Sequence, residues 1–171
     1  MKIKPKKLNH RELVKHARKW LAGECAVVVT EMSSGAGEEP DGIGFTADGR
    51  SILIECKATR ADMKADEKKV YRVEKGLGMG VHRYYLTPEG LLTEDDLPLG
   101  WGLLEVSYGR VRRIKCSVLW EPNERREIRL LVSAFRRFPN PPQGVSVRAY
   151  SIETLKRATL GIETQEKEED V

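Results

Sequence analysis

Two carboxylates and a lysine at a short spacing are the clearest chemical signal in this sequence. Pro40 and Asp41 precede a stretch of thirteen residues, which Glu55-Cys56-Lys57 follows. In proteins Mg²⁺ takes oxygen ligands, commonly one or two carboxylates together with waters and phosphate oxygens. An ammonium group beside such a site can stabilise the charge that develops on a phosphate in the transition state. The spacing therefore indicates metal-dependent cleavage of phosphodiester bonds.

The residues between the two acids predict a β-hairpin. Residues 47–49 (Ala-Asp-Gly) are typical of a tight turn, and the apolar run that leads into Glu55 predicts a strand. If the loop has three residues, Thr46 pairs with Arg50, and counting back along both arms places Asp41 opposite Glu55. Opposed residues in an antiparallel pair have Cβ atoms about 5 Å apart. Both carboxylates could therefore hold one divalent ion.

The second arm of this hairpin distributes its side chains between two faces. Glu55 and Lys57 are two residues apart and share one face, whereas Cys56 points the other way with Ile52 and Ile54. The run is apolar on both faces, which favours a central strand. The alternative is an exposed hairpin whose charges are simply solvated.

These residues resemble the pattern of the PD-(D/E)xK nuclease superfamily, which Pro40, Asp41, Glu55 and Lys57 carry here. The resemblance implies an α/β fold with a restriction-endonuclease-like core, in which helices flank a central mixed β-sheet. It implies that Asp41 and Glu55 bind Mg²⁺ or Mn²⁺, with the Cys56 carbonyl as a further ligand. It also implies that Lys57 lies beside the attacking water.

A longer match continues past the lysine. Residues 55–69 are similar to the MmcB-like DNA repair proteins of this superfamily, whose motif runs from the catalytic lysine through Ser-Arg-Ala-Asp-Phe and Ala-Asp-x-Lys. The matching residues are Arg60, Ala61, Asp62, Ala65, Asp66 and Lys68. Thr59 and Met63 depart from the motif. The resemblance implies a setting in DNA repair but does not establish a reaction.

The elements expected around the motif follow the order helix, strand, hairpin, helix, strand. That is the α-β-β-β-α-β order expected of the superfamily core. The predicted elements are a helix over 11–21 capped by Asn9 and ended by Gly23, a buried strand over 24–31, the hairpin, a helix from the Thr59–Asp62 capping box to about Lys75, a strand over 81–86, a helical turn over 93–97, strands over 101–107 and 110–115, a helix from Asn123 to about Phe138, a strand over 145–152 and a helix over 153–159.

Several charged side chains on the first two predicted helices can be assigned either a functional role or a place on the solvent-exposed surface. Many members of the superfamily place an extra acid of the first helix near the metal, and Glu12 is the candidate here; the alternative is an exposed glutamate. Lys64 and Lys68 are four residues apart and could grip a phosphate, or could pair with acids along the helix. His10 belongs to no metal-binding spacing, and no role is predicted for it.

The charge distribution favours a polyanionic partner. The net charge is +4, but residues 163–171 carry −4, so the other 162 residues carry +8. Positive charge is concentrated in residues 1–20 and 107–137. Basic clusters of this kind suit a phosphate backbone, although solvated surface charge is the alternative. The residues expected to contact nucleic acid are Arg60, Lys64, Lys68, Arg112 and Arg113, and Tyr71 and Tyr84 are candidates for stacking on bases.

Composition predicts a single cytoplasmic domain over residues 1–160 with an acidic, disordered tail over 161–171. No apolar run is long enough to span a membrane. The three cysteines have no zinc spacing and are expected to be reduced core residues.

The function that fits best is a Mg²⁺- or Mn²⁺-dependent endonuclease that hydrolyses DNA in repair, restriction or phage defence. The alternative is a non-catalytic nucleic-acid-binding module that keeps the nuclease-like fold. RNA as the substrate and a homodimer both remain open.

Overall fold

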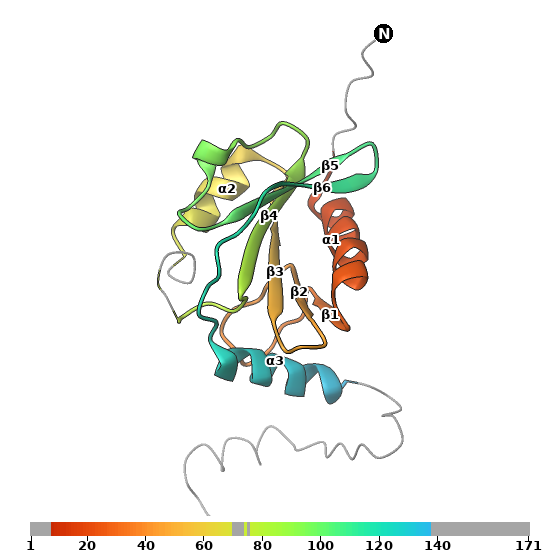
Figure 1. The fold of residues 1–171 in the computed structure, drawn as a ribbon, viewed down its shortest axis with the longest axis vertical. Coiled ribbons are helices and arrows are strands. Elements are labelled where there is room, and N and C mark those ends of the chain that lie inside the picture. Colours follow the sequence, from red (N-terminus) through yellow and green to blue (C-terminus); the bar gives the residue numbers. More distant parts are fainter. Residues whose placement is uncertain (1–7, 70–73, 75, 138–171) are drawn as a thin grey trace, which may run out of the picture. The chain divides into compact units, whose positions relative to one another are not determined.

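The structure, a computed structural model, describes residues 8–69, 74 and 76–137 (Figure 1). The chain divides into two units, Met1–Ala134 and Phe135–Val171, and the sheet and its core belong to the first. Several predicted features lie outside the described residues: the basic residues 1–7, Tyr71, the strand over 145–152, the helix over 153–159 and the acidic tail.

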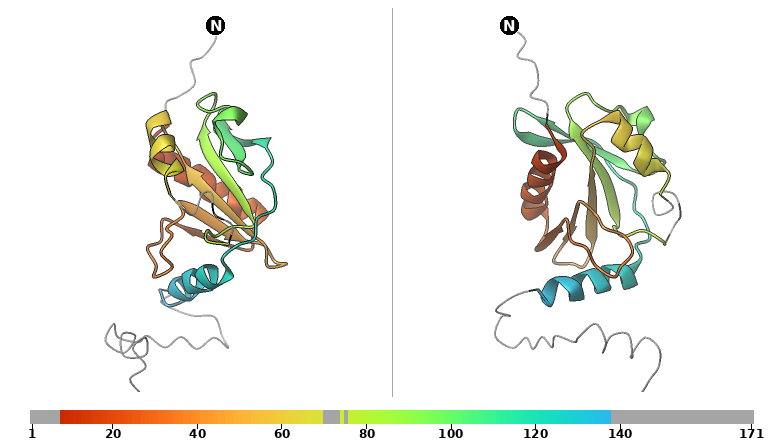
Figure 2. Two further views of the ribbon diagram at one scale, coloured as in Figure 1. Left: turned by 90° about the vertical axis from the view of Figure 1, so that its left-hand side faces the viewer. Right: turned by 180° about the vertical axis from the view of Figure 1, so that it is seen from behind.

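The described part of the chain is an α/β fold with one six-stranded mixed sheet flanked by helices, as the sequence predicts (Figures 1 and 2). The strands lie in the order β1 to β6. The pairs β1–β2, β2–β3 and β5–β6 are antiparallel, whereas β3–β4 and β4–β5 are parallel. The elements are α1 (His10–Glu24), β1 (Val27–Thr30), β2 (Gly42–Phe45), β3 (Ser51–Cys56), α2 (Arg60–Glu67), β4 (His82–Pro88), the 3₁₀ turn η2 (Glu94–Asp96), β5 (Gly102–Ser107), β6 (Arg110–Lys115) and α3 (Glu124–Phe135).

Helix α1 begins as the sequence predicts. The Asn9 side chain accepts a hydrogen bond from the Glu12 amide at 2.9 Å, and the Glu12 carboxylate accepts one from the Asn9 amide at 3.0 Å. This reciprocal capping box satisfies two amides that the first turn leaves without helical partners. The predicted end at Gly23 is wrong, because the helix runs on to Glu24 and Cys25 is its C-cap.

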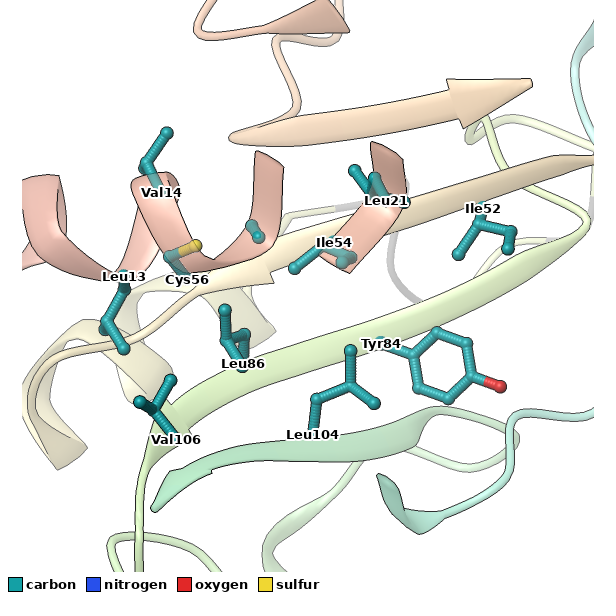
Figure 3. Packing of buried hydrophobic residues seen from close by; sticks show 11 residues of the cluster. Leu13, Val14, Leu21, Ile52, Ile54, Cys56, Tyr84, Leu86, Leu104 and Val106 are labelled. Atoms are coloured by element: carbon teal, nitrogen blue, oxygen red, sulfur yellow. The ribbon is translucent and has the colours of Figure 1, made fainter. Parts of the chain in front are cut away.

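One apolar face of α1 packs on the sheet (Figure 3). Leu13, Ala17 and Leu21 recur at helical spacing and are fully buried. They meet β3 side chains such as Ile54 and Cys56, which confirms that Cys56 points into the core. Strand β1 at the sheet edge is less covered than predicted, since Val27 is 43% exposed.

The opposite face of the sheet is covered by α2 and α3. Met63 of α2 and Leu130 of α3 share a buried cluster with Leu53, Tyr85 and other sheet residues. Helix α2 starts with the predicted capping box but ends at Glu67, with Lys68 as its C-cap. None of the helices in the described part of the chain is long and apolar enough to cross a membrane.

The central position of β3 predicts a large stability loss from Leu53→Ala. Leu53 is fully buried, and truncating such a leucine costs about 3 kcal/mol because it leaves a cavity. Urea unfolding would measure the loss. The matched control is Leu99→Ala at a residue that is 95% exposed, which should change the free energy of unfolding by less than about 0.5 kcal/mol. Equal losses from both substitutions would contradict the position of β3 in the core.

Candidate active site

The β2–β3 hairpin has the predicted register. Thr46 and Arg50 close the loop, with 2.8 Å between the Thr46 amide and the Arg50 carbonyl oxygen. Gly42 pairs with Ile54, so the next residues outward, Asp41 and Glu55, lie opposite each other. The two predicted metal ligands are thereby brought to one end of the hairpin.

Asp41 is oriented by its neighbours on β3 and α1. Its Oδ2 accepts a hydrogen bond of 2.7 Å from the Cys56 amide, and its Oδ1 is 3.4 Å from His10 Nε2. The same imidazole nitrogen is 3.8 Å from Glu31 Oε1. The Asp41 side chain is 19% exposed, so it remains open to solvent at the edge of the core.

The Cys56 thiol takes no part in this site. Burial raises its pKa, and the charges of Asp41 and Glu55 raise it further. The thiol is therefore neutral at physiological pH and packs as an apolar group. The predicted contribution of Cys56, a metal ligand from its carbonyl oxygen, stays a prediction.

Lys57 is a buried ammonium between two carboxylates. Its Nζ is 3.1 Å from Glu55 Oε2 and 3.3 Å from Asp66 Oδ1, and its side chain is 8% exposed. Burial lowers the pKa of this ammonium, but the carboxylates of Glu55 and Asp66 raise it by more, so the net shift is upward. Lys57 therefore brings a full positive charge to the site at neutral pH.

Asp66 was not predicted to belong to the site, although it lies within the motif. Its side chain is 2% exposed; its Oδ2 accepts a hydrogen bond of 2.9 Å from the Tyr85 hydroxyl, and its Oδ1 is 2.9 Å from Lys69 Nζ. A signal was present in the sequence, because Asp66 lies three residues after Met63 and both face the sheet.

Helix α1 brings His10 rather than Glu12 to Asp41. Residues two positions apart on an α-helix are separated by about 200° around its axis, so the side chains of His10 and Glu12 point in nearly opposite directions. Glu12 caps α1 and lines a cavity with Lys15 and Glu89. His10 lies one helical turn before the buried Val14, so helical spacing places it on that side of α1 although its own side chain is exposed.

The cations predicted to contact nucleic acid do not form one patch. Arg60 pairs with Asp96 through two hydrogen bonds of 2.8 and 3.1 Å, and Arg112 pairs with Glu89 at 2.7 Å. Exposed ion pairs of this kind are worth about 0–1 kcal/mol, so phosphates can compete for both arginines. Lys64 is exposed on α2, and Lys68 is exposed at its C-cap.

Arg113 lies on the α1 side of the sheet, away from α2. Its guanidinium is 5.4 Å from the centre of the Trp20 ring and 5.8 Å from that of Tyr84. Tyr84 is only 4% exposed and packs edge-to-face on Trp20. It is a core residue, so the prediction that it stacks on bases is wrong.

The donor set at the hairpin suits a hard divalent cation. Asp41 and Glu55 supply two carboxylates from opposed positions of the hairpin backbone, and Mg²⁺ commonly takes one or two together with waters and phosphate oxygens. Within residues 8–69, 74 and 76–137, no group of three or more His, Cys, Asp or Glu side chains is placed to hold a metal. Any bound ion would therefore depend on backbone, water or substrate oxygens for its remaining ligands.

Comparisons with known proteins show the fold alone. No family model matches the sequence, and no curated protein matches it. A solved structure, the SPO1766 protein of unknown function from Silicibacter pomeroyi, is similar with a TM-score of 0.61 and 22% identity. The similarity covers 87% of this chain and 100% of that chain, so the two share an α/β architecture.

Proposed function

We propose that the protein is a metal-dependent nuclease that hydrolyses phosphodiester bonds in DNA. The observation that carries the proposal is the position of Asp41 opposite Glu55, with the Lys57 ammonium 3.1 Å from Glu55. Two carboxylates and a charged lysine on one hairpin supply the residue types that this chemistry requires. The resemblance to the PD-(D/E)xK superfamily, and within it to MmcB-like DNA repair proteins, supports the same proposal.

Each residue has a proposed role. Asp41 and Glu55 would hold Mg²⁺ or Mn²⁺ with the Cys56 carbonyl, and a bound cation of this type polarises the phosphate and lowers the pKa of coordinated water. The Cys56 amide keeps the Asp41 carboxylate oriented through its hydrogen bond. Lys57 provides a positive charge that can stabilise the negative charge developing on the phosphate oxygens.

His10 takes the place that the sequence suggested for Glu12. Its Nε2 lies 3.4 Å from Asp41 Oδ1, so this imidazole is the group that α1 contributes beside Asp41. A neutral imidazole can bind Mn²⁺ better than Mg²⁺, which prefers oxygen ligands. The proposal therefore includes both ions.

A panel of substrates tests this function. Supercoiled plasmid, branched DNA and RNA would be incubated with Mg²⁺, Mn²⁺ or EDTA. We expect cleavage of DNA with either ion and none with EDTA. Cleavage that continues in EDTA, or cleavage of RNA alone, would contradict the proposal.

The non-catalytic binding module is supported by one feature of the same site. Glu55 and Asp66 already balance the Lys57 charge, and a buried ion network of this kind can be purely structural. A protein that binds DNA tightly but nicks none of the substrates with either ion would establish this alternative.

DNA affinity is expected to be largely electrostatic. Each phosphate neutralised by a lysine or arginine releases counterions, so the logarithm of the affinity should fall linearly with the logarithm of the salt concentration. Deleting residues 162–171, which carry the acidic end, should tighten binding at low salt because these acids compete with phosphates for the same cations. Fluorescence anisotropy with a labelled duplex measures both effects. An affinity that does not depend on salt would contradict this expectation.

A further inference from the structure

The Lys57 ammonium is shared between carboxylates from two different elements. Its Nζ is 3.1 Å from Glu55 Oε2 on β3 and 3.3 Å from Asp66 Oδ1 on α2. Both acidic side chains are only 2% exposed, so water screens these charges weakly. Of the two acids, Glu55 belongs to the proposed metal site and Asp66 does not.

Asp66 is itself held in a fixed position. The Tyr85 hydroxyl donates a 2.9 Å hydrogen bond to Oδ2, and the Tyr85 ring stacks on Trp101 with 4.5 Å between ring centres. Both aromatic residues are fully buried. An anchored carboxylate at this distance can retain the ammonium when its other partner is withdrawn.

A divalent cation and Lys57 compete for the same carboxylate. A cation bound at Glu55 attracts that carboxylate and repels an ammonium that lies within hydrogen-bonding distance of it. The ammonium cannot readily move into solvent, because its side chain is 8% exposed. It therefore needs a second partner inside the protein, and the described residues provide Asp66.

We propose that Asp66 is a positioning residue that retains the Lys57 ammonium when Glu55 binds a divalent cation. The inference rests on the proposed function, because it takes Glu55 as a metal ligand. Without the cation, Glu55 and Asp66 share the Lys57 ammonium; with the cation at Glu55, Asp66 alone keeps the ammonium beside the site. Asp66 thus raises the affinity for metal without contacting the metal.

A double-mutant cycle on Mn²⁺ affinity tests this role by isothermal titration calorimetry. The proteins are wild type, Asp66→Asn, Lys57→Met and the double variant, each checked for folding by circular dichroism. Lys57→Met should tighten Mn²⁺ binding about tenfold because the competing cation is gone, and Asp66→Asn should weaken it about tenfold, within the coupling seen for residues in one ion-pair network. When Lys57 is already methionine, Asp66→Asn should cost only about two- to threefold, which is the direct attraction of its charge.

The matched control is Asp62→Asn on the same helix. Asp62 caps α2 through the Thr59 amide and makes no ion pair with Lys57 among the described contacts. This variant removes one acidic charge from α2 and should leave Mn²⁺ affinity unchanged within about twofold. A loss as large as that of Asp66→Asn would show that the total negative charge of α2, rather than the ion pair between Asp66 and Lys57, controls Mn²⁺ affinity.

Two results overturn the inference. The first is an equal loss of affinity from Asp66→Asn with lysine and with methionine at position 57, which would mean that Asp66 acts on the ion directly. The second is no loss in either background. If Asp66→Asn does not fold, the ammonium protons of Lys57 can be followed by NMR in the wild-type protein. They should stay protected from exchange at saturating Mg²⁺, and their loss would also overturn the inference.

The proposed nuclease can fail separately from this inference. A wild-type protein that binds Mn²⁺ with the expected coupling but cleaves no DNA would remove the nuclease and leave the role of Asp66 intact. A protein that cleaves DNA but shows no coupling between Asp66 and Lys57 in Mn²⁺ affinity would leave the nuclease intact and remove the role of Asp66. A wild-type protein that binds no Mn²⁺ would overturn both.

Discussion

Asp41→Ala is expected to reduce Mn²⁺ affinity roughly a hundredfold or more, to the point where calorimetry detects no binding. Changes in residues that only support a metal ligand cost about 10- to 100-fold, and loss of a ligand should cost at least as much. Asp41 is one of the two acids at opposed positions of the hairpin, so in the proposed site its loss would leave Glu55 as the main anionic ligand. Titration with Mn²⁺ in the absence of DNA measures the effect without reference to activity.

Asp48→Ala is the matched control for this experiment. Asp48 lies in the loop of the same hairpin, where its side chain is 55% exposed and pairs with Arg50. Its pKa is lowered to about 2, first by the hydrogen bond from Thr46 and then by that from Arg50, so it is fully charged at neutral pH. Asp48→Ala should leave the Mn²⁺ titration unchanged. Unchanged titrations for both Asp41→Ala and Glu55→Ala would exclude a metal between these residues.

Lys57→Ala is expected to lower the rate of DNA cleavage roughly a hundredfold or more. That is the scale seen when a positioned group that stabilises transition-state charge is removed. DNA affinity should change little, because Lys57 is only one of the many cationic side chains that are expected to attract the phosphates. The control is Lys64→Ala, which removes an exposed lysine of α2 that is predicted to contact DNA; with saturating enzyme it should lower the cleavage rate by less than about threefold. Single-turnover cleavage with saturating enzyme separates this effect from binding, and equal rates for wild type and Lys57→Ala would show that Lys57 is not catalytic.

Lys57→Ala should also destabilise the protein, because Lys57 is buried. Removing the ammonium leaves the Glu55 and Asp66 carboxylates buried without the charge between them. Breaking a buried ion pair in this way costs about 3 kcal/mol or more. Rates should therefore be compared at a temperature where circular dichroism shows both proteins folded. Added Mn²⁺ should recover part of the loss, because a cation at Glu55 replaces the missing positive charge.

The hairpin could be predicted from sequence because its determinants are local. The turn residues 47–49 fix the loop, and alternation along 51–57 assigns each side chain to a face. Together they set the register that places Asp41 opposite Glu55. The capping residues Asn9 and Thr59 were predictable for the same reason, since a capping box spans only four residues.

The groups that surround the hairpin depend on how helices dock on the sheet, which no local pattern fixes. Asp66 reaches Lys57 only because α2 packs on the β3–β4 face, and His10 reaches Asp41 only because α1 packs on the other. The sequence left Glu12 open between a metal ligand and an exposed glutamate, and the phase of α1, which turns about 100° per residue, places His10 beside Asp41 instead. The burial of Tyr84 likewise depends on packing between elements distant in sequence, since it lies in the core cluster that α1 and the sheet form.

The most direct test of the account compares plasmid nicking by wild type and Glu55→Gln, purified in parallel. The substitution keeps the size of the side chain and removes the charge of a proposed ligand that lies 3.1 Å from Lys57. We expect the wild type to nick supercoiled DNA with Mn²⁺ and not with EDTA, and Glu55→Gln to be no faster than buffer alone. Equal nicking by both proteins would contradict the proposed active site, and no nicking by the wild type with either Mn²⁺ or Mg²⁺ would contradict the nuclease itself.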